Sequence, residues 1–219
     1  MRNFYFISNT LSATRAFRLA FATLVVAAVF AASPAPAMAA NPAEQFITDN
    51  VQKGLTILND KQLSTDLRRS KFRDFLLGLT DIKKIADYTL GQYRRGAPPA
   101  ALDAYEASFK EYALAVYQSY FAKYSGQTLK VTGSYPLAAD ETIVKTVMLD
   151  PNGKDNAKPL EVNFRVLNEG GRLVVVDFSV EGVWVRELER NDFTSYLGQN
   201  SGDIGALIAM LKKKTQMMR

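Results

Sequence analysis

From residue 41 onward, apolar residues recur at helical spacing. Ile47, Val51 and Leu55 follow one another every four residues, and Asn41 before Pro42 is typical of a helix N-cap. Similar patterns, separated by breaks rich in Gly, Pro, Asn and Asp, predict four further helices. These are expected over about 64–79, 80–90, 101–124 and 201–214.

After Gly126 the apolar period changes from helical to alternating. The alternation predicts strands over 129–133, 143–149, 160–166 and 173–185, the last as one strand or two with Gly182 at a bend. Turns are expected at 151–153 and 169–172. The connections are too short for crossover helices, so the strands should form an antiparallel meander.

Together these elements predict an α+β fold. We expect N-terminal helices packed on one face of a twisted antiparallel sheet of about four to five strands, followed by a C-terminal helix. An apolar cavity can form between the helices and the sheet in such a layout.

The first 39 residues have a different pattern. Arg2, Arg15 and Arg18 precede an apolar run over 19–32, and Ala-Met-Ala at 37–39 is typical of a cleavage site. This order indicates a secretory signal peptide. The apolar run is too short to span the roughly 30 Å of bilayer hydrocarbon as a helix, although an uncleaved anchor is the alternative.

Composition removes many kinds of chemistry. The chain of 219 residues has no Cys and no His, which excludes disulfides, thiolate nucleophiles, Ser-His-Asp triads and imidazole metal sites. An enzyme of this composition would depend on carboxylates, Lys, Tyr or Ser-Lys pairs. Most hydrolases and most transition-metal enzymes are therefore excluded.

The net charge of +5 is reduced once the signal peptide is set apart. Residues 1–39 hold three of the 27 basic residues and no acidic one, so 40–219 has 24 basic against 22 acidic residues and a net charge of +2. This is not the charge of a nucleic-acid-binding surface. The length of 40–219 suits one domain with one core.

Aromatic residues gather in the helical half. Seven of the nine tyrosines in 40–219 lie between Tyr88 and Tyr124. They can pack in the core with their hydroxyls reaching water, or several can line an apolar pocket with a polar mouth. The pattern alone leaves both open.

Three segments in order resemble the MlaC/Ttg2D family of periplasmic phospholipid carriers. They are LGQYRRGA at 90–97, VDFSVEGV at 176–183 and GALI at 205–208, the last preceded by Arg190 and Phe193 at a short turn into the last helix. The resemblance covers essentially all of 43–214. Trp184 departs from it, because the family usually has Ser after Glu-Gly-Val.

The resemblance implies an NTF2-like or MlaC-like fold. It implies a soluble, monomeric periplasmic protein that encloses the acyl chains of a phospholipid and leaves the head group near solvent. Such a protein is not an enzyme and needs no cofactor or metal. It would carry the lipid between an outer-membrane lipoprotein complex and an inner-membrane ABC transporter complex, in a system that maintains outer-membrane lipid asymmetry. The pocket should approach about 1,000 Å³.

The expected lipid contacts are apolar and aromatic residues of the helical half and of the inward strand faces. They are Phe75, Leu79, Leu90, Tyr93, Tyr105, Phe109, Tyr112, Val116, Val147, Val162, Phe164, Val166, Val176, Phe178 and Trp184.

Three other functions remain open from the sequence. The cargo could be another apolar molecule, such as a hopanoid or the acyl chains of a lipoprotein. The protein could be an interaction module without a ligand. It could also be a carboxylate-based envelope hydrolase, with Asp177 and Glu181 as the acidic pair, although four residues on a strand place them about 13 Å apart.

The signal-peptide assignment predicts that the mature protein begins at Ala40 and is recovered in the soluble periplasmic fraction. N-terminal sequencing of the protein from its own host tests this. A chain that begins at Met1 and sediments with membranes would contradict it.

Overall fold

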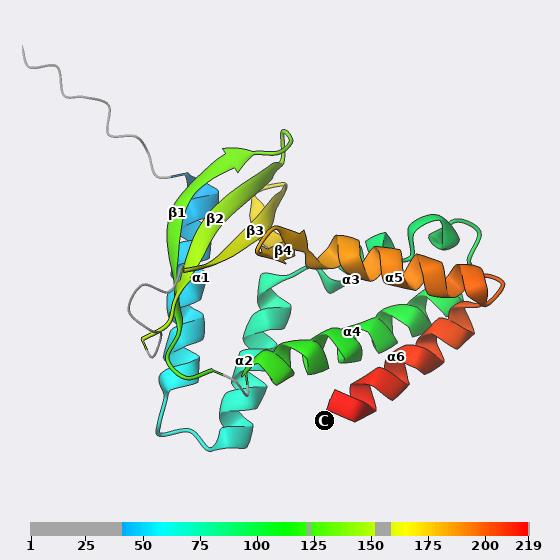
Figure 1. Cartoon of the computed structure of the whole chain (residues 1–219), viewed down its shortest axis with the longest axis horizontal. Helices are drawn as coiled ribbons and strands as arrows, with labels where there is room; N and C mark the ends of the chain where they lie inside the picture. Colours follow the sequence, from blue (N-terminus) through cyan, green and yellow to red (C-terminus); the bar gives the residue numbers. More distant parts are fainter. Residues whose placement is uncertain (1–40, 122–123, 152–158, 219) are drawn as a thin grey trace, which may run out of the picture. The chain divides into compact units, whose positions relative to one another are not determined.

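The computed structural model describes residues 41–121, 124–151 and 159–218 (Figure 1). The predicted signal peptide and most of the predicted turn at 151–153 lie outside these residues. The described residues form six α-helices, one 3-10 helix and five strands: α1 Pro42–Asn59, α2 Thr65–Leu79, α3 Ile82–Thr89, η1 Gly91–Arg94, α4 Pro99–Phe121, β1 Thr128–Pro136, β2 Glu141–Leu149, β3 Leu160–Glu169, β4 Arg172–Val180, β5 Val183–Trp184, α5 Val185–Gln199 and α6 Ile204–Met218.

The first three helices begin where the sequence places their caps. The side chains of Asn41, Ser64 and Asp81 accept hydrogen bonds from backbone N–H groups in the first turns of α1, α2 and α3. Each bond satisfies a donor that has no partner within its helix. These helix starts are therefore confirmed.

The sheet is an antiparallel meander with strand order β1-β2-β3-β4-β5, as predicted. The β4–β5 turn consists of Glu181 and Gly182, whose φ angles are 49° and 81°. Positive φ at both central residues is the requirement of a type I′ hairpin turn. The Glu181 side chain accepts a hydrogen bond from the backbone N–H of Glu161 at 2.7 Å, which ties this turn to β3.

One face of the sheet packs against α1, which runs along β1 and β2 (Figure 1). The buried contact joins Ala43 and Ile47 of α1 to Val144, Val166 and Val175 on three neighbouring strands. The apolar stripe of α1 and the alternation of the strands thus bury their apolar sides against each other.

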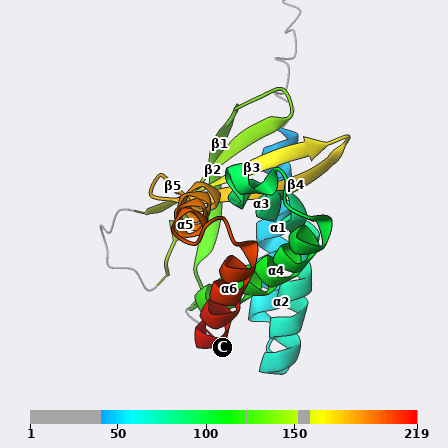
Figure 2. The ribbon, with the colours of Figure 1, turned by 90° about the vertical axis from the view of Figure 1, so that its right-hand side faces the viewer.

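The remaining helices build a second apolar core. α4 packs along α6, and α3 packs against α5, while α3 and α5 also contact β4. Figure 2 shows α4, α5 and α6 from the side of this core. Its buried members include Leu90, Tyr105, Phe193, Leu197 and Leu211. The helices therefore do not all cover one sheet face as the sequence suggested, although the α+β class is confirmed.

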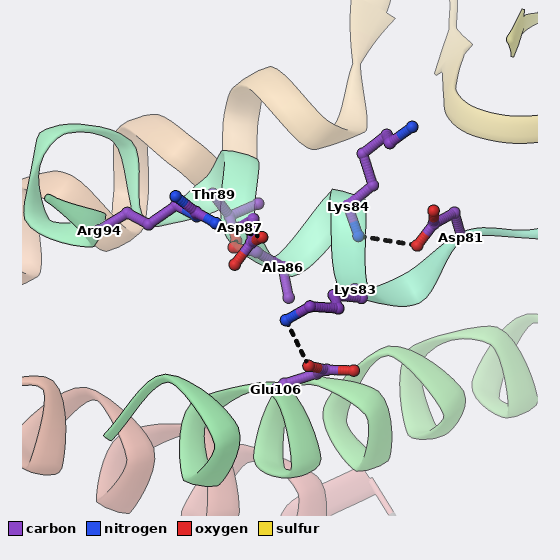
Figure 3. A network of polar contacts seen from close by, with 8 residues as sticks. All are labelled: Asp81, Lys83, Lys84, Ala86, Asp87, Thr89, Arg94 and Glu106. Carbon is purple, nitrogen blue, oxygen red and sulfur yellow. Dashed lines mark hydrogen bonds and ion pairs between the residues drawn. The ribbon is translucent and has the colours of Figure 1, made fainter. Parts of the chain in front are cut away.

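Polar contacts hold the outer side of α3 (Figure 3). Lys83 forms an ion pair with Glu106 of α4 at 3.0 Å, and Arg94 forms one with Asp87 at 3.0 Å. The first pair joins α3 to α4, and the second joins α3 to η1. Because these side chains are partly exposed, the pairs add little stability.

The helix α5 departs from the sequence-based expectation, which placed strand as far as residue 185 and then a short turn before the last helix. Its buried residues are Arg186, Phe193 and Leu197. A charged residue thus occupies the packed side of the helix. This hides the apolar period by which an amphipathic helix is recognised.

Asp177 of β4 holds the start of α5. Its Oδ1 accepts hydrogen bonds from the backbone N–H groups of Phe178, at 2.8 Å, and Arg186, at 2.9 Å. Its Oδ2 lies 3.7 Å from Nε of Arg186, and both side chains are buried. The N-cap residue Trp184 makes no side-chain capping bond, so a strand residue caps this helix instead.

We predict that Asp177→Ala lowers the free energy of unfolding by about 3 kcal/mol, because two backbone donors lose their acceptor and a buried guanidinium loses its carboxylate. Asp177→Asn should cost less, since its amide oxygen can still accept. Urea unfolding measures both losses.

The control is Asp192→Ala, at an exposed position of the same helix, for which we expect a change within about 0.5 kcal/mol. Equal midpoints for Asp177→Ala and Asp192→Ala would show that Asp177 does not hold α5.

Candidate functional site

A cavity of about 270 Å³, here called the sheet cavity, lies between α1, α2 and the α1-facing side of β1, β2 and β3. Its walls are almost entirely apolar. They are formed by Ile47, Asn50, Val51, Gly54, Leu55, Leu58, Phe72, Phe75, Leu76, Leu79, Tyr124, Gln127, Thr128, Leu129, Met148 and Phe164.

A glycine allows α1 and α2 to approach each other at this cavity. A Cβ on Gly54 would stand 3.3 Å from Cε1 of Phe75, closer than an ordinary contact. The rings of Phe72 and Phe75 lie 5.8 Å apart between their centroids, both on the cavity side of α2. The glycine thus lets two aromatic rings of α2 cover the apolar stripe of α1.

Polar groups occupy a small part of the sheet-cavity wall. Two of them, Tyr124 and Gln127, come from the short connection between α4 and β1, and a third, Thr128, is the first residue of β1. The fourth, Asn50, donates its side-chain amide to the carbonyl of Phe46 at 2.7 Å. The rest of the wall offers no group that would orient a polar ligand.

A second cavity, here called the helix cavity, has about 50 Å³ and lies between α3, α4, α5 and β4. Its lining mixes apolar and charged side chains: Thr80, Ile82, Ile85, Thr89, Phe109, Tyr112, Ala113, Val116, Tyr117, Val175, Val176, Asp177, Phe178, Val185, Arg186 and Glu189.

Two pairs of ionisable side chains meet at the helix cavity: Asp177 with Arg186, and Tyr112 with Glu189. The hydroxyl of Tyr112 donates to Glu189 at 2.8 Å. Burial raises the pKa of Glu189 above its ordinary value, although the Tyr112 hydrogen bond and Lys214 oppose this. Burial also raises the pKa of Tyr117 to about 12. At neutral pH the Tyr117 hydroxyl therefore stays protonated.

Eight of the fifteen expected contact residues line one of the two cavities. Phe75, Leu79 and Phe164 line the sheet cavity, and Phe109, Tyr112, Val116, Val176 and Phe178 line the helix cavity. Each cavity is smaller than the pocket of about 1,000 Å³ that the sequence led us to expect.

The other seven expected residues lie elsewhere. Val162 and Val166 are buried on the α1-facing side of β3, and Leu90, Tyr105 and Tyr93 belong to or pack against the core of α3–α6. Val147 alternates with Thr146, whose partner is Val162, and so Val147 points to the opposite sheet face. Val147 therefore does not line the sheet cavity, and its contact with lipid stays a prediction.

Trp184 also lies away from both cavities. It is half-buried at the start of α5, pairs with Ser179 across β4 and β5, and its ring lies 5.0 Å from the guanidinium carbon of Arg165. Trp184, where the family usually has Ser, therefore lies at the sheet edge and not in a cavity wall.

The sequence contained a signal for the cavity residues that we had not assigned. Ile47, Val51 and Leu55 form one apolar stripe in the sequence, but a stripe that lines a cavity has the same period as one that packs in a core. Only the position of α2 distinguishes the two. Leu129 and Met148, which pair across β1 and β2, belong to the same wall.

Two further findings concern the described residues. No group of three or more Asp or Glu residues there is placed to hold a metal ion. No helix in the same part of the chain has the length and apolar character needed to cross a membrane.

Comparison with known proteins adds two findings. A family model described as MlaC protein matches residues 48–213. The fold is similar to that of the phospholipid-binding protein from Ralstonia solanacearum, solved in complex with a phospholipid. The TM-score is 0.68 and the sequence identity 20%, over 80% of this chain and 98% of that chain.

The raised pKa of the half-buried Glu189 leads us to predict that the stability depends on pH. Because its folded-state pKa is raised above 4.5, its contribution to the free energy of unfolding is fully present below pH 4.5 and decreases as pH rises through the raised pKa. Glu189→Gln has no such loss. The variant should therefore gain stability relative to the wild type as pH rises.

Urea midpoints of both proteins between pH 4 and pH 8 measure this difference, with Asp103→Asn at an exposed position of α4 as control. A gap between wild type and Glu189→Gln that does not change with pH would contradict the assignment.

Proposed function

Since this chain belongs to the MlaC family, we propose that it is a lipid carrier that binds a phospholipid by its acyl chains. The observation that supports this most directly is the sheet cavity, an apolar space enclosed by α1, α2 and three strands. Such a space suits chains of methylene groups and offers little to a polar substrate.

The energetics of a lipid in water require such a carrier. Two acyl chains of ordinary length contain roughly 30 methylene groups, each worth about 0.8 kcal/mol when removed from water. A lipid therefore faces a cost of roughly 20 kcal/mol or more to leave a bilayer unaided. A protein that buries the chains needs only to match the bilayer.

We propose further that the carrier works in the periplasm, between an outer-membrane lipoprotein complex and an inner-membrane ABC transporter complex. Membership of the MlaC family and the signal-peptide pattern of residues 1–39 support this. The phospholipid held by the Ralstonia solanacearum protein of the same fold supports the choice of cargo.

The carboxylates considered for hydrolysis have other roles. Asp177 accepts backbone hydrogen bonds at the start of α5, and Glu181 accepts one from Glu161. Neither carboxylate lines the sheet cavity. These contacts favour binding over catalysis.

The test is mass spectrometry of an organic extract of the protein purified from its own periplasm. We expect diacyl phospholipid at about one per chain, released by solvent but not by dialysis. A hopanoid or a lipoprotein acyl chain in its place would replace the proposed cargo. An extract without any lipid would refute the proposal.

A charged side chain in the sheet cavity should abolish this binding. Phe164→Glu places a carboxylate among the acyl chains at a cost of several kcal/mol, so the lipid recovered per protein should decrease at least about tenfold. Circular dichroism on the same sample shows whether the variant is folded.

The control is Lys145→Glu, an exposed position on the opposite sheet face next to Val144, which pairs with Phe164. It should keep its lipid. A folded Phe164→Glu with normal lipid content would show that the sheet cavity does not hold the chains.

A further inference from the structure

The linings of the sheet cavity and the helix cavity meet at β3 and β4. Phe164 lines the first and Phe178 lines the second, and the two residues are directly paired across β3 and β4. The chain also passes from one to the other between Leu79 and Thr80. The linings of the two cavities are thus adjacent. We call the residues at which they meet the wall.

The wall has a fixed part and a side-chain part. At the fixed part, Thr80 forms a parallel backbone bridge with Val175 of β4. The other part consists of Phe164, Phe178 and Tyr117, with the rings of Tyr117 and Phe178 6.0 Å apart between centroids and tilted by 41°. Aromatic rings can be displaced by rotation about their side-chain bonds, whereas the backbone bridge cannot.

The volumes indicate that the wall matters for the cargo. The sheet cavity has about 270 Å³ and the helix cavity about 50 Å³, and each is below the range of roughly 300–1,000 Å³ typical of ligand sites. A chain that fills the sheet cavity would next meet the aromatic wall. Any further methylene must pass that wall or remain in water.

We infer that Phe178, supported by Tyr117, is the residue that determines acyl-chain length, by closing the sheet cavity toward the helix cavity. The inference rests on the proposed function, since it concerns the lipid that the carrier holds. Each methylene left in water reduces binding about fourfold, so a fixed wall discriminates between chains that differ by a few carbons.

The experiment compares the acyl chains bound by two variants that each lose one aromatic ring. Phe178→Ala opens the wall, while Tyr135→Ala removes an exposed ring of β1 that lines neither cavity. Each purified protein is equilibrated with vesicles of mixed phosphatidylcholines of different chain lengths. The bound lipids are then extracted and identified by mass spectrometry.

We expect the ratio of longer to shorter bound chains to increase about fourfold per additional methylene in Phe178→Ala, relative to the wild type. Tyr135→Ala should leave the preferred length within one methylene of the wild type. An equal shift in both variants, or no shift in Phe178→Ala, would overturn the inference.

Two further measurements keep the test decisive. If Phe178→Ala does not fold by circular dichroism, Phe178→Leu replaces it, with Tyr135→Leu as its control and the same expected contrast. If the wild type takes up no phospholipid from the vesicles, the proposed function itself fails. If it takes up lipid and the variants show no contrast, only the role of Phe178 fails.

Discussion

The apolar side of β3 and β4 is the surface that both groups of helices share. α1 and α2 lie over it on the β1–β3 side, and α3, α4 and α5 meet it at β4. Protein interiors are normally packed at the density of organic crystals, and unfilled apolar space costs stability. Here the helices cover the surface without filling the space beneath them, as a carrier of apolar chains requires.

Asp177 connects this surface to the helical core. It lies on β4 next to Phe178, and its carboxylate caps α5, from which Arg186 and Glu189 enter the helix cavity. Burial raises the pKa of Asp177 above its ordinary value, while the hydrogen bond from the backbone of Arg186 and the guanidinium charge of Arg186 oppose this. The motif at 176–183 therefore fixes the hairpin turn and the start of α5, a structural role for both of its acidic residues.

Local patterns in the sequence predicted much of this structure. Features that depend on residues far apart in the chain could not be predicted from them. The caps at Asn41 and Asp81 and the bend at Gly182 depend on neighbouring residues only, and all three are confirmed. The helix α5 was not predicted because Arg186 lies on its packed side, and the face of Val147 could not be predicted because β2 is apolar on both sides. The sheet cavity could not be predicted, because it depends on the position of α2 over α1, which no local pattern determines.

The most direct test of the sheet cavity as the acyl-chain site is photo-crosslinking with a phospholipid that carries a photoreactive group at the end of one chain. After loading, irradiation and proteolysis, we expect the label on peptides from α1, α2 and β3 that line the sheet cavity, such as those containing Leu55, Phe75 and Phe164. Label found mainly on exposed residues, such as Lys212 and Lys213 of α6, would contradict an enclosed site.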